Sequence, residues 1–214
     1  MYSKTERLCR NLRNKLCAPM RPHIAVFDDF FTDPNSVLDN IILGEFSDVE
    51  SPFDGVTYPA LQLKPNVDLK PVIEKILGEK IFVVTTFARL TSSAQPAAPN
   101  QIHPDTVMST HALLIYVSKD WAEGHGTSFW SHGKWGPSHD PRVQDNQELQ
   151  RDSNDESKWL RKSLVQGAFN RALFYDSKLF HRAEPVGGFG SGPADGRIVL
   201  TCFFNILQKL PIVK

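Results

Sequence analysis

The sequence is short of cysteine, of long apolar runs and of net charge, and each shortage excludes a class of protein. Its three cysteines, Cys9, Cys17 and Cys202, include no C-x-x-C pair, and an odd number is not a disulfide framework. Free thiols fit a reducing compartment, so we expect a cytoplasmic protein. No stretch approaches the ~20 apolar residues of a transmembrane helix, so no membrane association is expected.

Positive and negative side chains balance, because Lys plus Arg and Asp plus Glu each number 24. A broad nucleic-acid-binding surface needs a basic excess, so no nucleic-acid partner is expected. The remaining composition, 41% hydrophobic and 22% charged, is that of an ordinary soluble globular protein. A length of 214 residues is enough for one domain with a substantial core.

The expected organisation is one domain with an extension and an insertion. Residues 1–22 carry basic residues at roughly helical spacing but lack the apolar stretch of a signal peptide, and we expect an N-terminal extension there. Residues 23–214 form the domain. Within it, residues 131–157 are polar and rich in Gly, Pro, Asp and Asn. This segment is too long for a plain connection, which predicts a lid-like insertion.

The order of the expected elements, two helices followed by strands, favours a β-rich fold. Asp33 and Pro34 are a typical helix start, and a second helix is expected over 68–77. Residues 47–65 contain three prolines and predict a loop, while 159–165 fit either a helix or a strand. Runs of β-branched and aromatic residues predict strands over 23–31, 81–90, 111–117, 127–130, 168–175 and 197–207. The predicted fold class is mainly β (α+β), a sandwich, barrel or jelly roll.

The segment His103-Pro104-Asp105 is the first candidate for metal binding. In an extended chain, residues two apart point to the same side, so both side chains can reach one ion. Alone, an H-x-D match arises easily by chance. His181, which directly follows a predicted strand, raises its significance. Two histidines and one carboxylate make the facial triad of non-haem Fe(II) oxygenases, which leaves three adjacent coordination positions open.

Arg197 is the candidate for binding a second carboxylate-bearing molecule. It begins the last predicted strand, where Arg197, Val199 and Thr201 share one face. An arginine there can pair with a carboxylate as a bidentate fork, and the Thr201 hydroxyl can add a hydrogen bond. A dicarboxylate such as 2-oxoglutarate could then chelate iron at one end and bind Arg197 at the other. The alternative for Arg197 is a surface salt bridge on an edge strand.

The ordered set His103-x-Asp105, His181, Arg197 and Thr201 resembles the Fe(II)/2-oxoglutarate-dependent dioxygenase superfamily, specifically its prolyl-hydroxylase-like branch. The segments HIAVFDDFFTDP and HALLIYVSKDWAEGHGTSFW also resemble that family, so the resemblance spans nearly the whole chain. It implies a double-stranded β-helix (distorted jelly roll) with flanking N-terminal helices. It also implies a hydroxylase that uses Fe(II), 2-oxoglutarate and O2 and releases succinate and CO2.

Further candidate residues would lie around the cosubstrate and the substrate. Tyr116 is the nearest candidate for a tyrosine that contacts 2-oxoglutarate. Arg89, Gln101, His125 and Trp130 are candidates for substrate binding, although Arg89 and Gln101 fit surface positions equally well. The substrate is expected to be amino-acid-derived, another small molecule or a peptide. The sequence indicates no oligomeric state.

Three further hypotheses stay open. A second metal site at His125, His132 and His139 has no regular ligand spacing to support it. The whole domain is either the oxygenase described above, a catalytically silent jelly-roll binding module, or a cupin-like metalloenzyme that does not use 2-oxoglutarate. The complete triad counts against the silent module, and Arg197 discriminates against the cupin-like enzyme.

Overall fold

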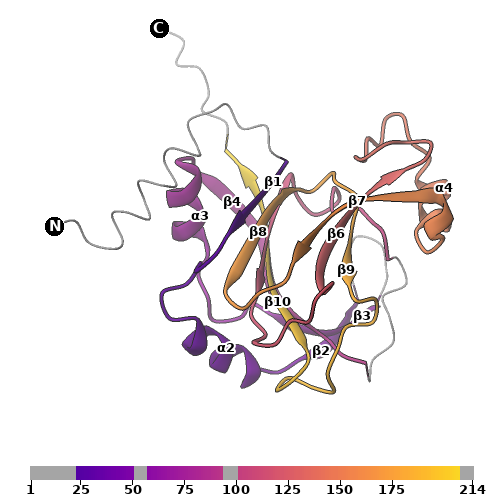
Figure 1. Cartoon of the computed structure of the whole chain (residues 1–214). Helices are drawn as coiled ribbons and strands as arrows, with labels where there is room; N and C mark the ends of the chain where they lie inside the picture. Colours follow the sequence, from indigo (N-terminus) through magenta and orange to yellow (C-terminus); the bar gives the residue numbers. More distant parts are fainter. Residues whose placement is uncertain (1–22, 51–56, 94–100, 208–214) are drawn as a thin grey trace, which may run out of the picture.

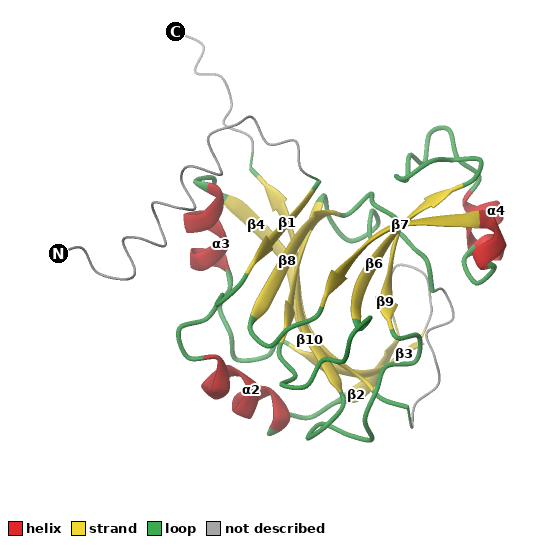
Figure 2. Ribbon diagram, in the orientation of Figure 1, coloured by secondary structure: helices red, strands yellow, loops and turns green. Residues whose placement is uncertain are grey.

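A computed structural model describes residues 23–50, 57–93 and 101–207. In these ranges the chain is mostly β-strand, arranged as two antiparallel sheets with helices at the periphery (Figures 1 and 2). The fold class predicted from the sequence, a mainly β jelly roll, is confirmed. In the described residues, no helix is long and apolar enough to cross a membrane.

The larger sheet has seven strands in the order β1-β8-β5-β10-β4-β3-β2. Every neighbouring pair is antiparallel, and β10 lies between β5 and β4. The strands are β1 Ile24–Phe27, β2 Ser47–Glu50, β3 Thr57–Leu63, β4 Ile81–Thr91, β5 His111–Tyr116, β8 Arg171–Asp176 and β10 Arg197–Ile206.

The smaller sheet has three strands in the order β7-β6-β9 and also pairs antiparallel. They are β6 Gly126–His132, β7 Trp159–Gln166 and β9 His181–Glu184. From β5 to β10 the chain passes from the larger sheet to the smaller one and back twice. That alternation is the winding of a double-stranded β-helix, as the resemblance implied.

Two helices cover the outer face of the larger sheet. α2 Pro34–Ile42 begins at Asp33, whose carboxylate accepts a hydrogen bond of 3.2 Å from the Ser36 amide. α3 Lys70–Leu77 ends at Gly78, whose φ of 69° lies in the left-handed region that glycine tolerates. Both helices were predicted, and both bury apolar side chains against the sheet, among them Ile41 and Ile73.

The alternation along β10 divides the core into two layers. Ile198, Leu200, Cys202 and Phe204 point to the helices, while Val199 and Phe203 point between the two sheets. All of these side chains are buried, and each fully buried large apolar side chain contributes roughly 1.5–3 kcal/mol. The space between the sheets is where the polar site residues gather.

The prediction of a loop over residues 47–65 is wrong for residues 47–50 and 57–63, which form β2 and β3 at one side of the larger sheet. Residues 51–56 lie outside the described residues. Pro59 lies inside β3, which is flanked by β4 and β2, and proline is tolerated there because the register between β2 and β3 shifts around it. A register shift in β2 and a positive φ of 51° at Ala60 break the regular alternation. The ambiguous segment 159–165 is a strand, β7.

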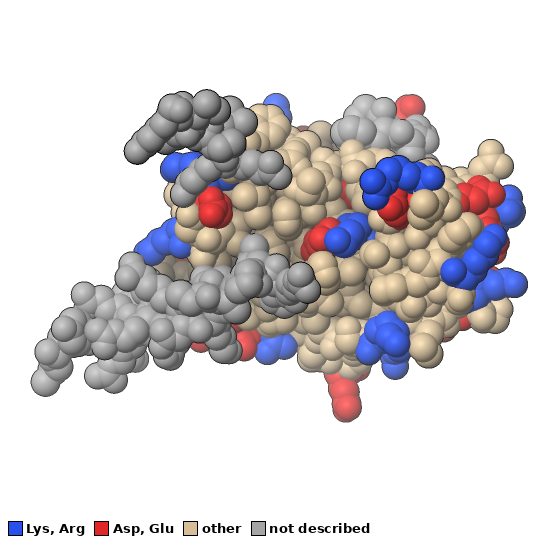
Figure 3. Space-filling view, turned by 90° about the horizontal axis from the view of Figure 1, so that it is seen from above, with Lys and Arg blue, Asp and Glu red and all other residues tan. Residues whose placement is uncertain are grey.

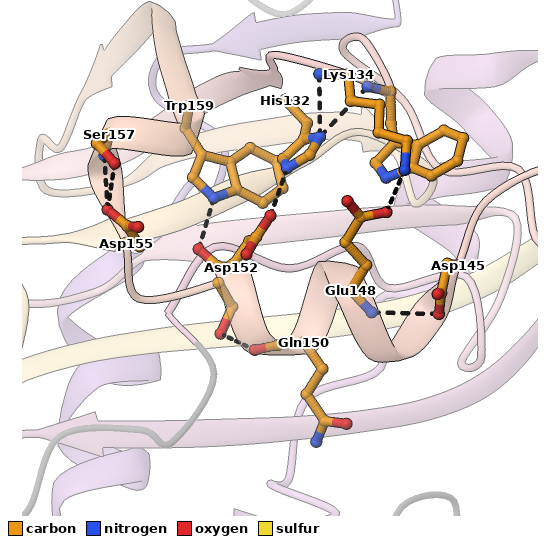
Figure 4. A network of polar contacts seen from close by, with 11 residues as sticks. His132, Lys134, Asp145, Glu148, Gln150, Asp152, Asp155, Ser157 and Trp159 are labelled. Carbon is orange, nitrogen blue, oxygen red and sulfur yellow. Dashed lines mark hydrogen bonds and ion pairs between the residues drawn. The ribbon is translucent and has the colours of Figure 1, made fainter.

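The predicted insertion lies between β6 and β7 at one end of the molecule (Figure 1). It contains α4 Asn146–Asp152 and the short 3-10 helix η1 Glu156–Lys158. Polar contacts hold it together (Figure 4): Lys134 pairs with Glu148 at 2.7 Å, and His132 Nε2 lies 3.1 Å from Asp152 Oδ2. The segment is thus an ordered subdomain, and its action as a lid stays a prediction.

Candidate metal centre

Backbone pairing brings the predicted metal ligands together. His103 and His181 exchange two hydrogen bonds, of 3.1 and 3.0 Å, so the H-x-D segment lies alongside β9 at the edge of the smaller sheet. The Asp105 amide donates to the Ser177 carbonyl at 2.7 Å, which fixes the carboxylate beside the end of β8. One ligand atom from each of the three side chains lies within 4.8 Å of the others.

The hydrogen bonds of the two imidazoles determine which nitrogen faces the centre. His103 Nδ1 lies 3.0 Å from the Gln101 carbonyl, and His181 Nδ1 lies 2.9 Å from the Leu179 carbonyl. A carbonyl only accepts, so each Nδ1 carries a proton, and in the neutral imidazole each Nε2 is left with its lone pair. The two Nε2 atoms lie 3.6 and 3.2 Å from the Asp105 carboxylate. This is the arrangement of metal-binding histidines oriented by a second hydrogen bond.

The electrostatics of the three groups suit a cation. Burial lowers the pKa of His103, which favours its neutral form. Burial acts to raise the pKa of Asp105, but the adjacent His181 and the hydrogen bonds around the carboxylate hold it below its usual value. Burial acts to lower the pKa of His181, and the Asp105 carboxylate outweighs that effect and raises it. A divalent cation would compete with the proton that Asp105 attracts to His181.

Tyr175 is a member of the site that the sequence did not reveal. Its hydroxyl donates a hydrogen bond of 2.8 Å to Asp105 Oδ2 and lies 3.3 Å from His181 Nε2. Burial raises the pKa of Tyr175 well above its ordinary value, so the phenol keeps its proton. The available signal was the alternation of β8, which places Tyr175 on the same face as buried Leu173.

Arg197 lies on the same inner surface and has almost no partner. Its side chain is 2% exposed, its Nε is buried without a hydrogen bond, and its nearest polar contact is Thr91 Oγ1 at 3.4 Å. The guanidinium carbon is 5.8 Å from the centre of the Trp121 ring. Burial lowers the pKa of Arg197 to about 10, so it remains charged at neutral pH. The alternative of a surface salt bridge is therefore wrong.

Tyr116 and Thr201 lie on this inner surface too. Thr201 is buried on β10, two residues beyond Val199. The Tyr116 hydroxyl donates to Thr127 Oγ1 at 2.9 Å, which connects the larger sheet to β6 of the smaller one. Its ring packs edge-on against Trp121, with centroids 4.8 Å apart. Burial raises the pKa of Tyr116 to about 12.

Of the four substrate-binding candidates, Arg89 has its side chain on the inner face with the metal ligands and Arg197. It lies on β4 opposite Val199. Gln101 contributes its carbonyl to His103, a role of the backbone. His125 stacks on Phe189, with ring centroids 5.0 Å apart, and its Nδ1 is buried without a partner.

Trp130 lies on the opposite face of β6 from the metal ligands. It packs in an outer cluster that includes Phe180, and its Nε1 donates to Ser128 Oγ at 2.7 Å. Its neighbour Phe129 points inward and contacts the Tyr175 ring, with centroids 5.8 Å apart. Because side chains alternate along a strand, one of these two residues had to point away from the site.

The histidines of the hypothetical second metal site have separate partners. His132 pairs with Asp152, while His139 contacts Thr106 Oγ1 at 2.8 Å and Asn146 Oδ1 at 2.7 Å. Within ranges 23–50, 57–93 and 101–207, the triad is the single group of three or more His, Cys, Asp or Glu side chains that converge on one point.

Comparisons with known proteins identify the fold. No protein-family model and no curated protein matches the sequence. The epimerase SnoN, in a crystal structure with Fe3+, alpha ketoglutarate and nogalamycin RO, aligns with a TM-score of 0.56 at 12% identity, over 98% of this chain and 91% of that one. A prolyl hydroxylase from Trichoplax adhaerens, in complex with a hypoxia inducible factor peptide fragment, aligns with a TM-score of 0.53 at 12% identity.

The prolyl-hydroxylase alignment covers 94% of this chain and 90% of that one. The alpha ketoglutarate dependent carbocyclase SnoK from nogalamycin biosynthesis aligns with a TM-score of 0.53 at 11% identity, over 95% and 83% of the two chains. At such identities the comparisons show the fold alone, and at that level they confirm the resemblance stated from the sequence.

Proposed function

We propose that this chain is an Fe(II)/2-oxoglutarate-dependent oxygenase that hydroxylates an unactivated C–H bond of an amino-acid-derived, other small-molecule or peptide substrate. The reaction consumes substrate, 2-oxoglutarate and O2 and yields hydroxylated substrate, succinate and CO2. One observation carries the proposal. Two Nε2 lone pairs and one carboxylate converge on a point between the same sheets that bury the unpaired cation of Arg197.

His103, Asp105 and His181 would hold the iron. When bound, the iron with 2-oxoglutarate would supply the activation of O2 and the oxidation of the C–H bond. The protein supplies the rest: carbonyls that fix both imidazoles, and Tyr175, whose hydrogen bond orients the carboxylate. The apolar side chains of the inner layer, such as Phe129 and Leu179, exclude water from the centre.

Arg197 would bind the carboxylate of 2-oxoglutarate that does not reach the metal. A buried guanidinium without an anion is unfavourable by several kcal/mol, and a bidentate carboxylate removes that penalty. Thr91 contacts Arg197 from β4, and Thr201 shares the face of β10 on which Arg197 lies. The hydroxyls of both threonines can donate to the same carboxylate. The Tyr116 hydroxyl already donates to Thr127. We therefore propose that Tyr116 packs against Trp121, whose ring lies next to Arg197, rather than contacting 2-oxoglutarate.

The names of the aligned structures support iron and 2-oxoglutarate as the ligands of this site, and they widen the range of reactions to be considered. Fe3+ and alpha ketoglutarate are bound in the SnoN crystal structure, whose fold this chain shares. SnoN and SnoK are an epimerase and a carbocyclase. Hydroxylation is therefore one of several products that the same site can give, and product analysis must accompany the assay.

The two other classes of function lack such support. A silent binding module gives no reason for two histidines oriented by Nδ1 hydrogen bonds toward one carboxylate. A cupin-like enzyme without 2-oxoglutarate gives no reason for a buried, unpaired Arg197.

We also propose a cytoplasmic location, on the basis of the free and buried Cys202. On the face drawn in Figure 3, Lys and Arg side chains are interspersed with Asp and Glu side chains.

An anaerobic titration tests the proposal. Fe(II) and 2-oxoglutarate are added to the apoprotein, and the weak visible charge-transfer band of the chelate is followed. We expect the band only with both ligands present, and we expect no band in His181→Ala. Arg142→Leu, which changes an exposed arginine of the insertion, serves as a control that keeps the band. If the folded wild-type protein with both ligands shows no charge-transfer band, the proposal is overturned.

A further inference from the structure

A second buried guanidinium faces the same space as Arg197. Arg89 lies on β4, in register with Val199 of β10 and Leu61 of β3. Along β4 it alternates with residues of the outer layer and shares its face with Phe87, which packs between the sheets, and with Thr91, the contact of Arg197. Arg89 is thus a diagonal neighbour of Arg197 across two paired strands.

Arg89 has no acidic partner among the described residues. Its Nε is buried without a hydrogen bond, and its guanidinium carbon lies 5.4 Å from the centre of the Tyr58 ring. Burial lowers the pKa of Arg89, and the Asp105 carboxylate acts in the opposite direction, although the two groups form no ion pair within 4.0 Å. The side chain therefore lies within electrostatic range of the metal centre without being neutralised by it.

Elsewhere the fold supplies carboxylates to its structural arginines. Buried Arg182 bonds to Glu184 Oε1 at 2.8 Å and to Glu156 Oε1 at 2.6 Å. Arg171 bonds to Asp28 at 2.6 Å. A buried cation that is left unpaired is costly, so the absence of a protein carboxylate beside Arg89 and Arg197 in the described residues points to anions that arrive with ligands.

The charges of the site leave one anion to be supplied. Asp105 carries one negative charge, while Arg89, Arg197 and a divalent metal ion carry four positive charges in total. The dianionic cosubstrate cancels two of the remaining three, so one positive charge persists. Glu184, whose charge also acts on Arg197, is already paired with Arg182. A monoanion beside Arg89 completes the balance.

We propose that the substrate carries a carboxylate and that Arg89 binds it, placing the substrate between β4 and the metal centre. This inference rests on the proposed function and names the substrate class. The planar guanidinium matches a carboxylate as a two-pronged donor. A phosphate monoester offers the same shape but brings nearly two negative charges at neutral pH, one more than the site lacks.

The test measures binding near the metal without turnover. Mn(II) replaces Fe(II), 2-oxoglutarate is present at saturation, and paramagnetic relaxation of probe protons is recorded by NMR. The probes are N-acetylglycine, N-acetyl-L-leucine and phenylacetate, each matched with its neutral carboxamide, and phenyl phosphate. We expect at least one acid to bind roughly tenfold or more tightly than its amide, as a charge-assisted hydrogen bond requires.

The variants separate the two arginines. Arg89→Leu should abolish the preference for the acid and leave the affinity for 2-oxoglutarate within about threefold, a difference below 1 kcal/mol. Arg89→Lys should keep part of the preference because the charge remains. Arg197→Leu should instead lose 2-oxoglutarate, and Arg142→Leu should behave as wild type.

Four outcomes would overturn the inference. These are equal binding of every acid and amide, a preference that survives in Arg89→Leu, loss of 2-oxoglutarate from Arg89→Leu, and preferential binding of phenyl phosphate over the acids. In each of these cases wild-type protein still binds Mn(II) and 2-oxoglutarate, so the proposed function stands. Failure of the wild type to bind 2-oxoglutarate would instead overturn the proposed function and this inference together.

Discussion

The hydroxyl of Tyr175 donates to the same carboxylate oxygen of Asp105, Oδ2, that lies 3.2 Å from His181 Nε2. The other oxygen, Oδ1, faces His103 Nε2 at 3.6 Å. The carboxylate is thereby held in one orientation, with an oxygen toward each imidazole. A single phenol on β8 thus sets the geometry of a centre whose other members come from the H-x-D segment and β9.

Replacing Tyr175 by Phe should weaken metal binding while leaving the fold intact. The variant removes the hydrogen bond to Asp105 and keeps the ring that packs against Phe129. Loss of such an outer partner typically lowers metal affinity by about 10–100-fold. Mn(II) titration followed by EPR measures the change. Tyr116→Phe, whose hydroxyl bonds to Thr127, is the matched control, and equal affinities in the two variants would contradict the prediction.

Metal affinity should keep rising with pH beyond the ordinary histidine range. The raised pKa of His181 means that its proton is lost only above about 6.5, the value of a free histidine. Because the metal needs the neutral imidazole, affinity falls as pH drops through that raised pKa. The same proton stabilises the apoprotein at low pH, and that contribution disappears as pH rises through the folded-state pKa. Affinities measured from about pH 5.5 to 8.5 check this, and a plateau starting near 6 would contradict it.

Two buried arginines should respond oppositely to substitution by leucine. Arg197→Leu removes an unpaired buried cation, so the free energy of unfolding should be unchanged or should increase by about 1 kcal/mol. Arg182→Leu strands the buried carboxylate of Glu184 and should cost about 3 kcal/mol. Urea unfolding without ligands measures both.

Added 2-oxoglutarate with Mn(II) distinguishes the two variants further. It should stabilise Arg182→Leu by mass action, as it does the wild type, and should fail to stabilise Arg197→Leu. A large loss of stability in Arg197→Leu would mean that this arginine is structural, and the assignment of its cosubstrate would fall with it.

Trp130→Phe should affect stability and spare the metal centre. The indole bonds to Ser128, and the Arg182 guanidinium carbon lies 4.7 Å from the centre of its ring, so its loss should cost about 1–2 kcal/mol. The affinities for Mn(II) and 2-oxoglutarate should stay within about twofold of wild type. Thermal unfolding and ligand titration together check this. If Trp130→Phe changes the affinity for a ligand but leaves the stability unchanged, Trp130 contributes to the binding site and the prediction is wrong.

The sequence predicted what is encoded locally and missed what depends on which face of a strand a residue occupies. The three candidate ligand residues could be picked out because a metal needs particular donors at particular spacings, and the structure brings them together. Trp130 was placed with the substrate and Tyr175 was not singled out, since in runs buried on both sides, such as β6 and β8, no polar alternation marks the inner face. The position of Arg89, in the pocket or on the surface, was also left open, because an arginine in a strand is normally solvated.

The edge strands show a second limit. β2 and β3 form although Pro59 lies inside β3, because β3 pairs with both β2 and β4 through hydrogen bonds that no local pattern predicts. The end of α3 at Gly78, by contrast, followed directly from the chemistry of one residue. A single sequence predicts local backbone preferences. It does not predict which strands pair, because the partners come from distant parts of the chain.

The two backbone hydrogen bonds between His103 and His181 join segments from opposite halves of the sequence. The segment that these bonds close contains strands β5 to β8, and closing a loop of that length costs conformational entropy. The candidate ligand set is therefore a product of tertiary structure and cannot form from local contacts alone. An unfolded or misassembled chain would lack the site, so a bound metal ion would report that the two halves of the sequence have come together.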